Sequence, residues 1–313
     1  MAALAPAVVQ AQAARAARIG FLYPGVTAVA GPRLAALREG MKAAGYADPE
    51  KVEILVRAAE GDPTRMVPGA AELVAGKVDA IVAISPSAVR AAKAATATLP
   101  IIANDLESDP IASDFVASLA RPGGNITGVF SDFPDFGMKW LELLKEAMPR
   151  LARAVIFWDP ATGPTQLAAV QEAGRRLDVG LQVVEVPAIA SLQGAFARAT
   201  ELKPDAVVLL SSPIFGTNPK LIADLALSHR IAIATLFSEI AKAGGLMAYG
   251  PNLMGTFQQT GTMVAKVLQG VRPADLPVER PSRFELVINA ATAKALGIAL
   301  PTSVLLRADE VVE

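Results

Sequence analysis

Short apolar runs alternate with helical segments along almost the whole chain. The run RIGFLYP precedes a helical segment at Pro32–Tyr46, and VEILVRAA precedes another at Thr64–Lys77. These runs are continuously hydrophobic and do not alternate in polarity, which is typical of strands covered by helices on both faces. The pattern therefore predicts α/β architecture with parallel sheets.

The alternation falls into two series. Arg121-Pro122-Gly123-Gly124 interrupts it, and NITGVF then opens a second series with RAVIFWD, LQVVEVP, DAVVLLSS and IAIATLF. Two doubly wound lobes follow from this division. The last segments are too short for a third lobe, so we expect them to complete the first two. The predicted lobes are 18–124 with 250–282, and 125–249 with 283–313, joined by three crossings.

Composition excludes several classes of protein. Hydrophobic residues make up 52% of the chain and charged residues 19%, which favours a folded protein with a large core. A net charge of -1 gives no basic surface for nucleic acid. The chain has no cysteine, which excludes thiol catalysis and disulfides, and it has no apolar run of membrane-spanning length.

The first 17 residues differ from the rest. They hold a short apolar stretch and Ala11-Gln12-Ala13, which fits a signal-peptide cleavage site, but the basic segment that should precede it is missing. We interpret residues 1–17 as a truncated secretion signal, with an alanine-rich leader as the alternative. The signal interpretation predicts a periplasmic protein.

The ends of the predicted strands carry hydroxyl, acidic and aromatic side chains. They are Tyr23, Ser85-Pro86-Ser87, Asn104-Asp105, Trp158-Asp159, Ser211-Ser212 and Phe237-Ser238-Glu239. Ligands of parallel α/β sheets bind beyond the carboxyl ends of the strands. The positions therefore indicate a small-molecule site with apolar walls and a few polar groups.

Ser85-Pro86-Ser87 allows two interpretations. Ser85 could be an N-cap with Pro86 in the first helical position, which is a common way to begin a helix. The hydroxyls and free N–H groups could instead receive a small anion such as a carboxylate. Both alternatives remain open from this stretch alone.

Catalytic and metal motifs are not found. The chain lacks a dinucleotide fingerprint, a phosphate loop and a nucleophile elbow, and its one histidine, His229, stands at a helix end. Asp105, Glu107 and Asp109 form an acidic loop that is more typical of a solvated surface than of a metal site. The sequence predicts no enzyme, no cofactor and no metal.

Four stretches resemble one bacterial family. They are ASLARPGGNITGV, AGGLMAYGP, RPADLPVERPSRFELVINAATAKALGIALP and the closing RADEVVE. Together they resemble the ABC-transporter substrate-binding proteins that include tryptophan- and tyrosine-binding members. The resemblance implies the type I periplasmic binding-protein fold, a small organic ligand such as an amino acid between two closing lobes, and a permease and ATPase as separate chains. It also implies a monomer.

The resemblance also suggests roles for individual residues. Ser85, Ser87 and Asn104-Asp105 match positions that hold a ligand carboxylate, and Glu239 matches an acid that meets the ammonium group. Four rings could wall the pocket: Tyr23, Trp158, Phe237 and Tyr249. Asp159 and Ser211 complete the candidate set.

Two departures from the family pattern leave the ligand open. NDLESDP is longer and more acidic than expected, so its extra acid could recruit another cationic group or bind water, and VLLSSP offers hydroxyls where an acid is expected. Two other functions share the scaffold. A ligand-sensing effector domain would need a separate DNA-binding chain, and a racemase-like enzyme would need the cysteines that are absent.

Overall fold

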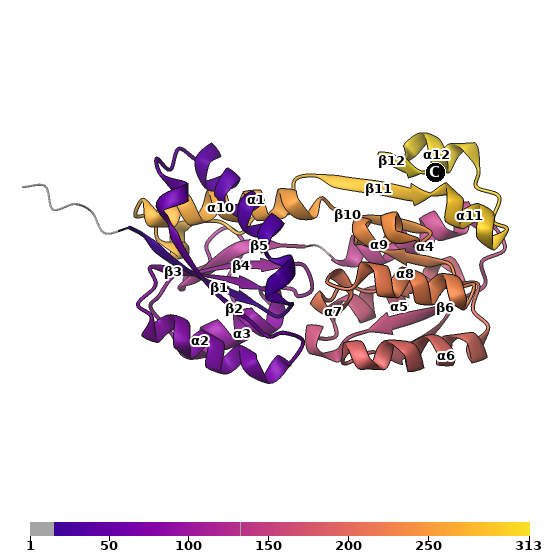
Figure 1. The fold of residues 1–313 in the computed structure, drawn as a ribbon, viewed down its shortest axis with the longest axis horizontal. Coiled ribbons are helices and arrows are strands. Elements are labelled where there is room, and N and C mark those ends of the chain that lie inside the picture. Colours follow the sequence, from indigo (N-terminus) through magenta and orange to yellow (C-terminus); the bar gives the residue numbers. More distant parts are fainter. Residues whose placement is uncertain (1–15, 132) are drawn as a thin grey trace, which may run out of the picture.

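Two α/β lobes lie side by side in the computed structural model, which describes residues 16–131 and 133–313 (Figure 1). Three chain segments connect the lobes, in agreement with the predicted number of crossings. The expected leader, residues 1–17, lies outside the described residues except for its last two positions.

The first lobe is a five-stranded parallel sheet between two pairs of helices. Its strands are β1 (Arg18–Tyr23), β2 (Glu53–Ala58), β3 (Ala80–Ile84), β4 (Ile101–Asp105) and β5 (Ile126–Phe130), in the order β2-β1-β3-β4-β5. Its helices are α1 (Gly31–Ala43), α2 (Met66–Ala75), α3 (Ser85–Ala95) and α10 (Leu253–Leu268).

Successive residues of each strand point to opposite faces of this sheet, and both faces are apolar. Phe21 packs in one core cluster with Leu37 of α1 and Phe257 of α10, whereas Leu22 packs in another with Leu73 of α2 and Val89 of α3. Burial on both faces explains why the strand reads as a continuous hydrophobic run.

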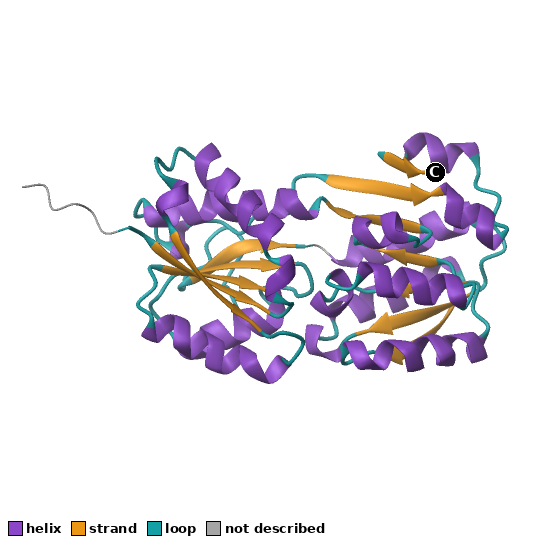
Figure 2. Cartoon of the chain, viewed as in Figure 1, coloured by secondary structure: helices purple, strands orange, loops and turns teal. Residues whose placement is uncertain are grey.

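The second lobe is a seven-stranded sheet in the order β12-β11-β10-β9-β8-β6-β7. Its strands are β6 (Arg153–Trp158), β7 (Gly180–Glu185), β8 (Ala206–Leu209), β9 (Ile233–Thr235), β10 (Met247–Pro251), β11 (Phe284–Asn289) and β12 (Glu310–Val312). Its helices are α4 (Phe133–Ala147), α5 (Thr165–Leu177), α6 (Leu192–Leu202), α7 (Pro213–Gly216), α8 (Pro219–Ser228), α9 (Ser238–Ala243), α11 (Ala290–Leu296) and α12 (Thr302–Arg307) (Figure 2).

Strand directions bring the carboxyl edges of the two sheets together. β5 ends where the chain leaves the first lobe, and β10 ends where the chain returns to it. The strands parallel to each therefore also end facing the other lobe. β11 is antiparallel to β10 because it starts at this junction and runs away from it (Figure 1).

One predicted boundary is wrong by a strand. Asn125 was expected to open the second lobe, but Ile126–Phe130 pairs with β4 and forms the edge of the first sheet. The Gly123-Gly124 break is thus a turn into the last strand of the first lobe. The first crossing comes only after Phe130.

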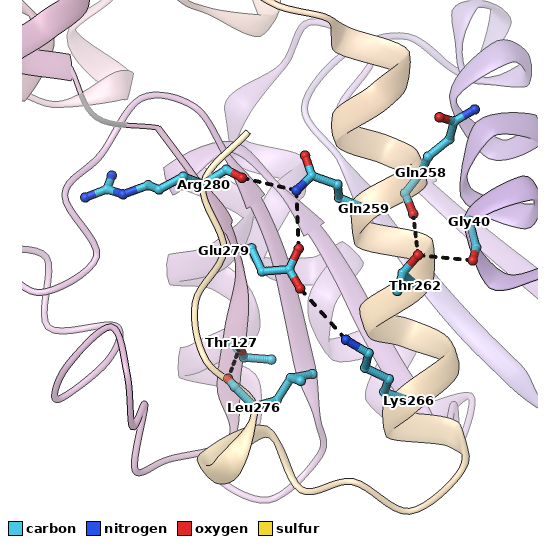
Figure 3. Close-up of polar contacts among 9 residues, drawn as sticks. All are labelled: Gly40, Thr127, Gln258, Gln259, Thr262, Lys266, Leu276, Glu279 and Arg280. Carbon is cyan, nitrogen blue, oxygen red and sulfur yellow. Dashed lines mark hydrogen bonds and ion pairs between the residues drawn. The ribbon is translucent and has the colours of Figure 1, made fainter. Parts of the chain in front are cut away.

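The segment before β11 lies against β5 and extends the first sheet. The Glu279 N–H donates to the Gly128 carbonyl over 2.9 Å, and the Phe130 N–H donates to the Glu279 carbonyl over 3.0 Å. The Thr127 hydroxyl donates to the Leu276 carbonyl over 2.7 Å (Figure 3). This segment is therefore fixed to the first lobe until it crosses.

Helix α10 also holds this segment. Gln259 donates from its side-chain amide to a Glu279 carboxylate oxygen over 3.2 Å and to the Arg280 carbonyl over 3.1 Å. Lys266 lies 4.0 Å from the other oxygen of the Glu279 carboxylate (Figure 3). The side chain of Glu279 thus connects the crossing segment to two turns of one helix.

Direct hydrogen bonds join the three crossings to one another. Arg280 donates from Nη1 to the Ser131 carbonyl over 2.6 Å, which links the third crossing to the first. The Asn252 N–H donates to the Arg283 carbonyl over 2.9 Å, and its side-chain amide donates to Glu285 over 2.8 Å, which links the second to the third. The crossings therefore form one hinge.

Helices α1 and α10 approach each other at two glycines. A Cβ on Gly40 would lie 1.8 Å from the Gln258 carbonyl oxygen, and one on Gly261 would lie 2.0 Å from the Leu37 carbonyl oxygen. The Thr262 hydroxyl donates to the Gly40 carbonyl over 3.2 Å across the same contact (Figure 3). No side chain fits there without separating the helices.

We expect Gly261→Ala to lower the free energy of unfolding by about 1–3 kcal/mol, the usual cost of overpacking. Gly194→Ala is the control, because a Cβ on this α6 residue would contact nothing within 4 Å. The control should gain about 0.5–1 kcal/mol from helix propensity. Urea denaturation measures both, and equal stabilities of the two variants would contradict the close helix contact.

Candidate functional site

Two spaces lie between the lobes at the facing strand ends. Both are open to solvent, and together with the adjoining solvent the first spans about 400 Å³ and the second about 450 Å³. Pro213 of α7 lines both of them, so they are neighbours. We call them the first and the second cavity.

The first cavity has mostly apolar walls and contributions from both lobes. The first lobe provides Tyr23, Arg33, Ile84, Asn104, Leu106, Glu107, Leu253 and Phe257, and the second provides Pro213, Gly216, Thr217 and Phe237. Arg33 is 9% exposed and Glu107 is 5% exposed. One buried cation and one buried acid thus face an otherwise apolar space.

Arg33 lies beside the Tyr23 ring, with its guanidinium carbon 5.5 Å from the ring centroid. Its Nη1 donates to the Val29 carbonyl over 2.6 Å, and no described carboxylate forms an ion pair with it. Burial raises the pKa of the Tyr23 hydroxyl, which Arg33 opposes and Glu239 of the second lobe reinforces. Charges of both signs therefore act on this ring from the two lobes.

Glu107 connects the lobes directly. Its Oε1 accepts a 2.6 Å hydrogen bond from the hydroxyl of Ser211, which follows β8 and is fully buried. Its Oε2 has no hydrogen-bond partner among the described residues. The Ser211 bond forms only when the lobes meet, so it marks a closed arrangement.

Asp105 and Glu107 form a buried pair of carboxyl groups. Asp105 accepts hydrogen bonds from the Glu107 N–H over 2.9 Å, from the Ser108 N–H over 3.0 Å and from the Ser108 hydroxyl. Burial nevertheless raises the pKa of Asp105 to about 6. Burial and the neighbouring Asp105 raise the pKa of Glu107 well above its usual range.

The second cavity holds the predicted serines. Ser85, Ser87 and Asp159 line it, and Asp159 accepts hydrogen bonds from the Ser212 hydroxyl over 2.6 Å and the Ala161 N–H over 2.9 Å. Burial raises the pKa of Asp159. The serines are thus separated from the walls formed by Tyr23 and Phe237, although the resemblance places them in one site.

Ser85 does not form the side-chain cap that one of the two interpretations predicted. The N-cap position of α3 falls on Ile84, and no side-chain hydrogen bond caps this helix. Ser85 has a φ of 74°, a left-handed conformation that is costly for a residue other than glycine. Such strain recurs at functional sites, so the anion interpretation of this turn remains open.

Three other candidates have structural roles. The Asn104 amide lines the first cavity but donates to Thr256 and Thr260 of α10 over 3.2 and 3.0 Å. Trp158 donates from its indole to the Gly163 carbonyl over 3.1 Å. Tyr249 stacks on Phe284 at the hinge, with ring centroids 6.2 Å apart. Neither of these last two rings lines either cavity.

Sequence reasoning missed Arg33. It lies in the first turn of α1, where the helix dipole favours an acid and not a cation. A basic residue in the first turn of the α-helix that follows the first strand was the available signal. Glu107 was noticed only as part of an acidic loop, because the sequence does not reveal that this loop is buried.

Some features are absent from the part of the chain that the structure describes. Within residues 16–131 and 133–313, no group of three or more acidic, histidine or cysteine side chains could hold a metal ion. No helix within the same ranges is long and apolar enough to cross a membrane.

Comparison with known proteins assigns the family. Residues 29–312 match the profile of the ABC transporter substrate binding proteins. The chain belongs to this family. A tyrosine-binding protein of Clostridioides difficile is 26% identical over 254 residues, which cover 80% of this chain and 72% of that protein.

Solved structures of family members share the fold. The ABC domain from Streptococcus pneumoniae, solved in complex with L-Trp, is 27% identical with a TM-score of 0.86, covering 95% of this chain and all of that one. The predicted type I periplasmic binding-protein fold, with two lobes and three crossings, is confirmed. The chain is a solute-binding protein of the ABC transporter class.

A further solved structure shows the same two-lobed fold. A ligand-free, open substrate-binding protein from Clostridium difficile is 24% identical and covers 95% of this chain and 99% of that one, with a TM-score of 0.64.

The buried carboxyl pair predicts a pH dependence of stability. An acid whose pKa is raised by folding binds its proton more tightly in the folded state, so its contribution to stability is lost as pH rises. The contribution of Asp105 is lost between its ordinary pKa of 3.8 and its raised pKa of about 6. The contribution of Glu107, whose pKa is raised well above its ordinary value, is lost at higher pH. Stability should therefore fall more between about pH 5 and about pH 8 in wild type than in Glu107→Gln. Urea denaturation across this range tests it, and parallel curves would contradict the prediction.

Proposed function

We propose that the chain is the solute receptor of an ABC import system and that its ligand is an amino acid or a related organic acid with an apolar side chain. One observation carries this proposal. A buried guanidinium and a buried carboxyl group line the same apolar cavity between two lobes. The relatives that bind tyrosine or L-Trp support the same ligand class.

Arg33 is the proposed partner of the ligand carboxylate. Its side chain is buried, lines the first cavity and has no described carboxylate as an ion-pair partner. Removing a cation from water without an anion is costly, and a ligand carboxylate would supply that anion. The flat guanidinium also matches a carboxylate in shape and can bind both oxygens.

The apolar walls are the proposed contacts of the side chain. Tyr23, Phe257 and Leu253 line one side of the cavity and Phe237 the other. Phe237 fits against α7 because Gly216 has no side chain, since a Cβ there would lie 2.7 Å from the ring. Rings on both lobes could enclose an apolar or aromatic group as the lobes close.

The remaining parts of the proposal are consistent with the family assignment. The receptor works in the periplasm as a monomer, delivers its ligand to a separate permease and ATPase, and catalyses no reaction. Glu239 remains a candidate for the ligand ammonium group, because one oxygen of its carboxylate is buried without a hydrogen-bond partner among the described residues. Ser85, Ser87 and Asp159 remain candidates for a second contact with a larger ligand.

A panel of the twenty amino acids tests the ligand class. Binding at one hundred times Kd should raise the free energy of unfolding by about 2.7 kcal/mol. We therefore expect at least one apolar or aromatic amino acid to raise Tm clearly, and NAD, ATP and DNA to leave it unchanged. A Tm increase with nucleotides alone would contradict the receptor function.

Arg33→Gln should weaken the binding of the best amino acid about tenfold or more, because a hydrogen bond to a charged group contributes about 1.5–3 kcal/mol. Arg38→Gln is the matched control. Arg38 lies on the same helix but donates to the Val52 carbonyl and pairs with Glu50. Calorimetry gives both affinities. If Ser87→Ala weakens binding more than Arg33→Gln does, the carboxylate belongs in the second cavity instead.

A further inference from the structure

Glu107 and Asp105 are buried acids without a cation. Glu107 is 5% exposed and Asp105 is fully buried, and no described lysine, arginine or histidine forms an ion pair with either. A third acid, Asp159, is close enough to raise the pKa of Glu107 further. Asp105 and Glu107 of the first lobe and Asp159 of the second thus lie near the surface where the lobes close, and no described cation forms an ion pair with any of them.

The other charges around Glu107 do not neutralise it. Arg33 lines the same cavity but its guanidinium is bound to Val29 and lies beside Tyr23. Glu239 adds a further acid near Tyr23. The group that faces Glu107 from the second lobe is the Ser211 hydroxyl, which is uncharged. Glu107 therefore has no cationic partner among the described residues.

A buried acid pair can exist in two ways. It can keep a proton, or it can take a cation from outside. The raised pKa of Glu107 indicates that this pair keeps a proton. Because Glu107 also lines the first cavity, a ligand in that cavity could provide a cation instead.

We propose that the amino group of the ligand binds at Glu107, which lines the first cavity and whose Oε2 is buried without a hydrogen-bond partner among the described residues, and that it displaces a proton from that carboxyl group. This inference rests on the proposed function, because it places the ammonium group of an amino acid whose carboxylate binds Arg33. The Ser211 hydroxyl of the second lobe positions Glu107 of the first lobe by donating to its Oε1. Glu107 is therefore in place only when the lobes have closed.

The exchange balances in charge. The ligand enters with its ammonium group protonated, the Glu107 carboxyl releases its proton to solvent, and a carboxylate–ammonium pair takes the place of the neutral acid. Each ligand bound therefore releases up to one proton. A ligand without an amino group leaves the proton on Glu107, so the site distinguishes amino acids from their deaminated analogues.

Glu239 is the alternative acceptor. The family resemblance assigns the ammonium group to it, and it too has an oxygen without a hydrogen-bond partner among the described residues. It differs from Glu107 in two respects, because it is only half-buried and it is not among the residues that line the first cavity. The geometry favours Glu107, and the two variants Glu107→Gln and Glu239→Gln distinguish them.

Calorimetry with two probe pairs tests the proposal. The pairs are L-tyrosine with 3-(4-hydroxyphenyl)propionate and L-leucine with 4-methylpentanoate, each measured near neutral pH in phosphate and in Tris. The difference in heat between the buffers gives the number of protons released. We expect wild type to release protons with the amino acid that it binds and none with the deaminated partner, which should bind at least tenfold more weakly.

Glu107→Gln keeps the shape of the side chain and an oxygen that can accept from Ser211. It should lose at least tenfold in affinity for the amino acid, release no proton and bind the deaminated partner as wild type does. Glu239→Gln should keep the proton release. If Glu107→Gln retains wild-type affinity, or Glu239→Gln alone abolishes the proton release, the assignment is wrong. If wild type binds none of the twenty amino acids, the proposed function itself fails.

Discussion

The two lobes can face each other because the three crossings are hydrogen-bonded into one hinge. Arg280 joins the third crossing to the first, and Asn252 joins the second to the third. A single linker would leave the lobes free to turn in any direction, whereas three linked segments restrict them mainly to opening and closing. The hydrogen bond between Glu107 and Ser211 requires one relative orientation of the two sheets, and this restriction lets that orientation form each time the lobes close.

Closure brings together charges that each lobe keeps apart. The first lobe carries Arg33, Asp105 and Glu107, and the second carries Asp159 and Glu239. Apolar walls around them lower the local dielectric, which strengthens every charge interaction and increases the cost of an unpaired charge. A ligand that supplies one anion and one cation would therefore favour the closed state by more than its apolar contacts alone.

Much of the fold could be predicted from the sequence, because burial on both faces leaves continuous hydrophobic runs that are easy to read. The site was less predictable. Tyr23 and Phe237 line the first cavity as expected from the strand ends. Trp158 at the end of β6 and Tyr249 within β10 instead contact Gly163 and Phe284. The end of a strand determines at which edge of the sheet a residue lies, whereas the conformation of the following loop determines where the side chains of loop residues point. Loop conformation, as at Ser85, depends on contacts between segments distant in sequence.

The close crossing of α1 and α10 has a consequence for the order in which the protein is made. Phe257, Met263 and Val264 of α10 complete the core of a lobe whose five strands end at Phe130. The ribosome has therefore produced the whole sheet of the first lobe, and most of the second, before the helix that covers one face of that sheet exists. During this interval the apolar face around Phe21 and Val82 lacks its native cover, so chaperones would meet an incomplete lobe.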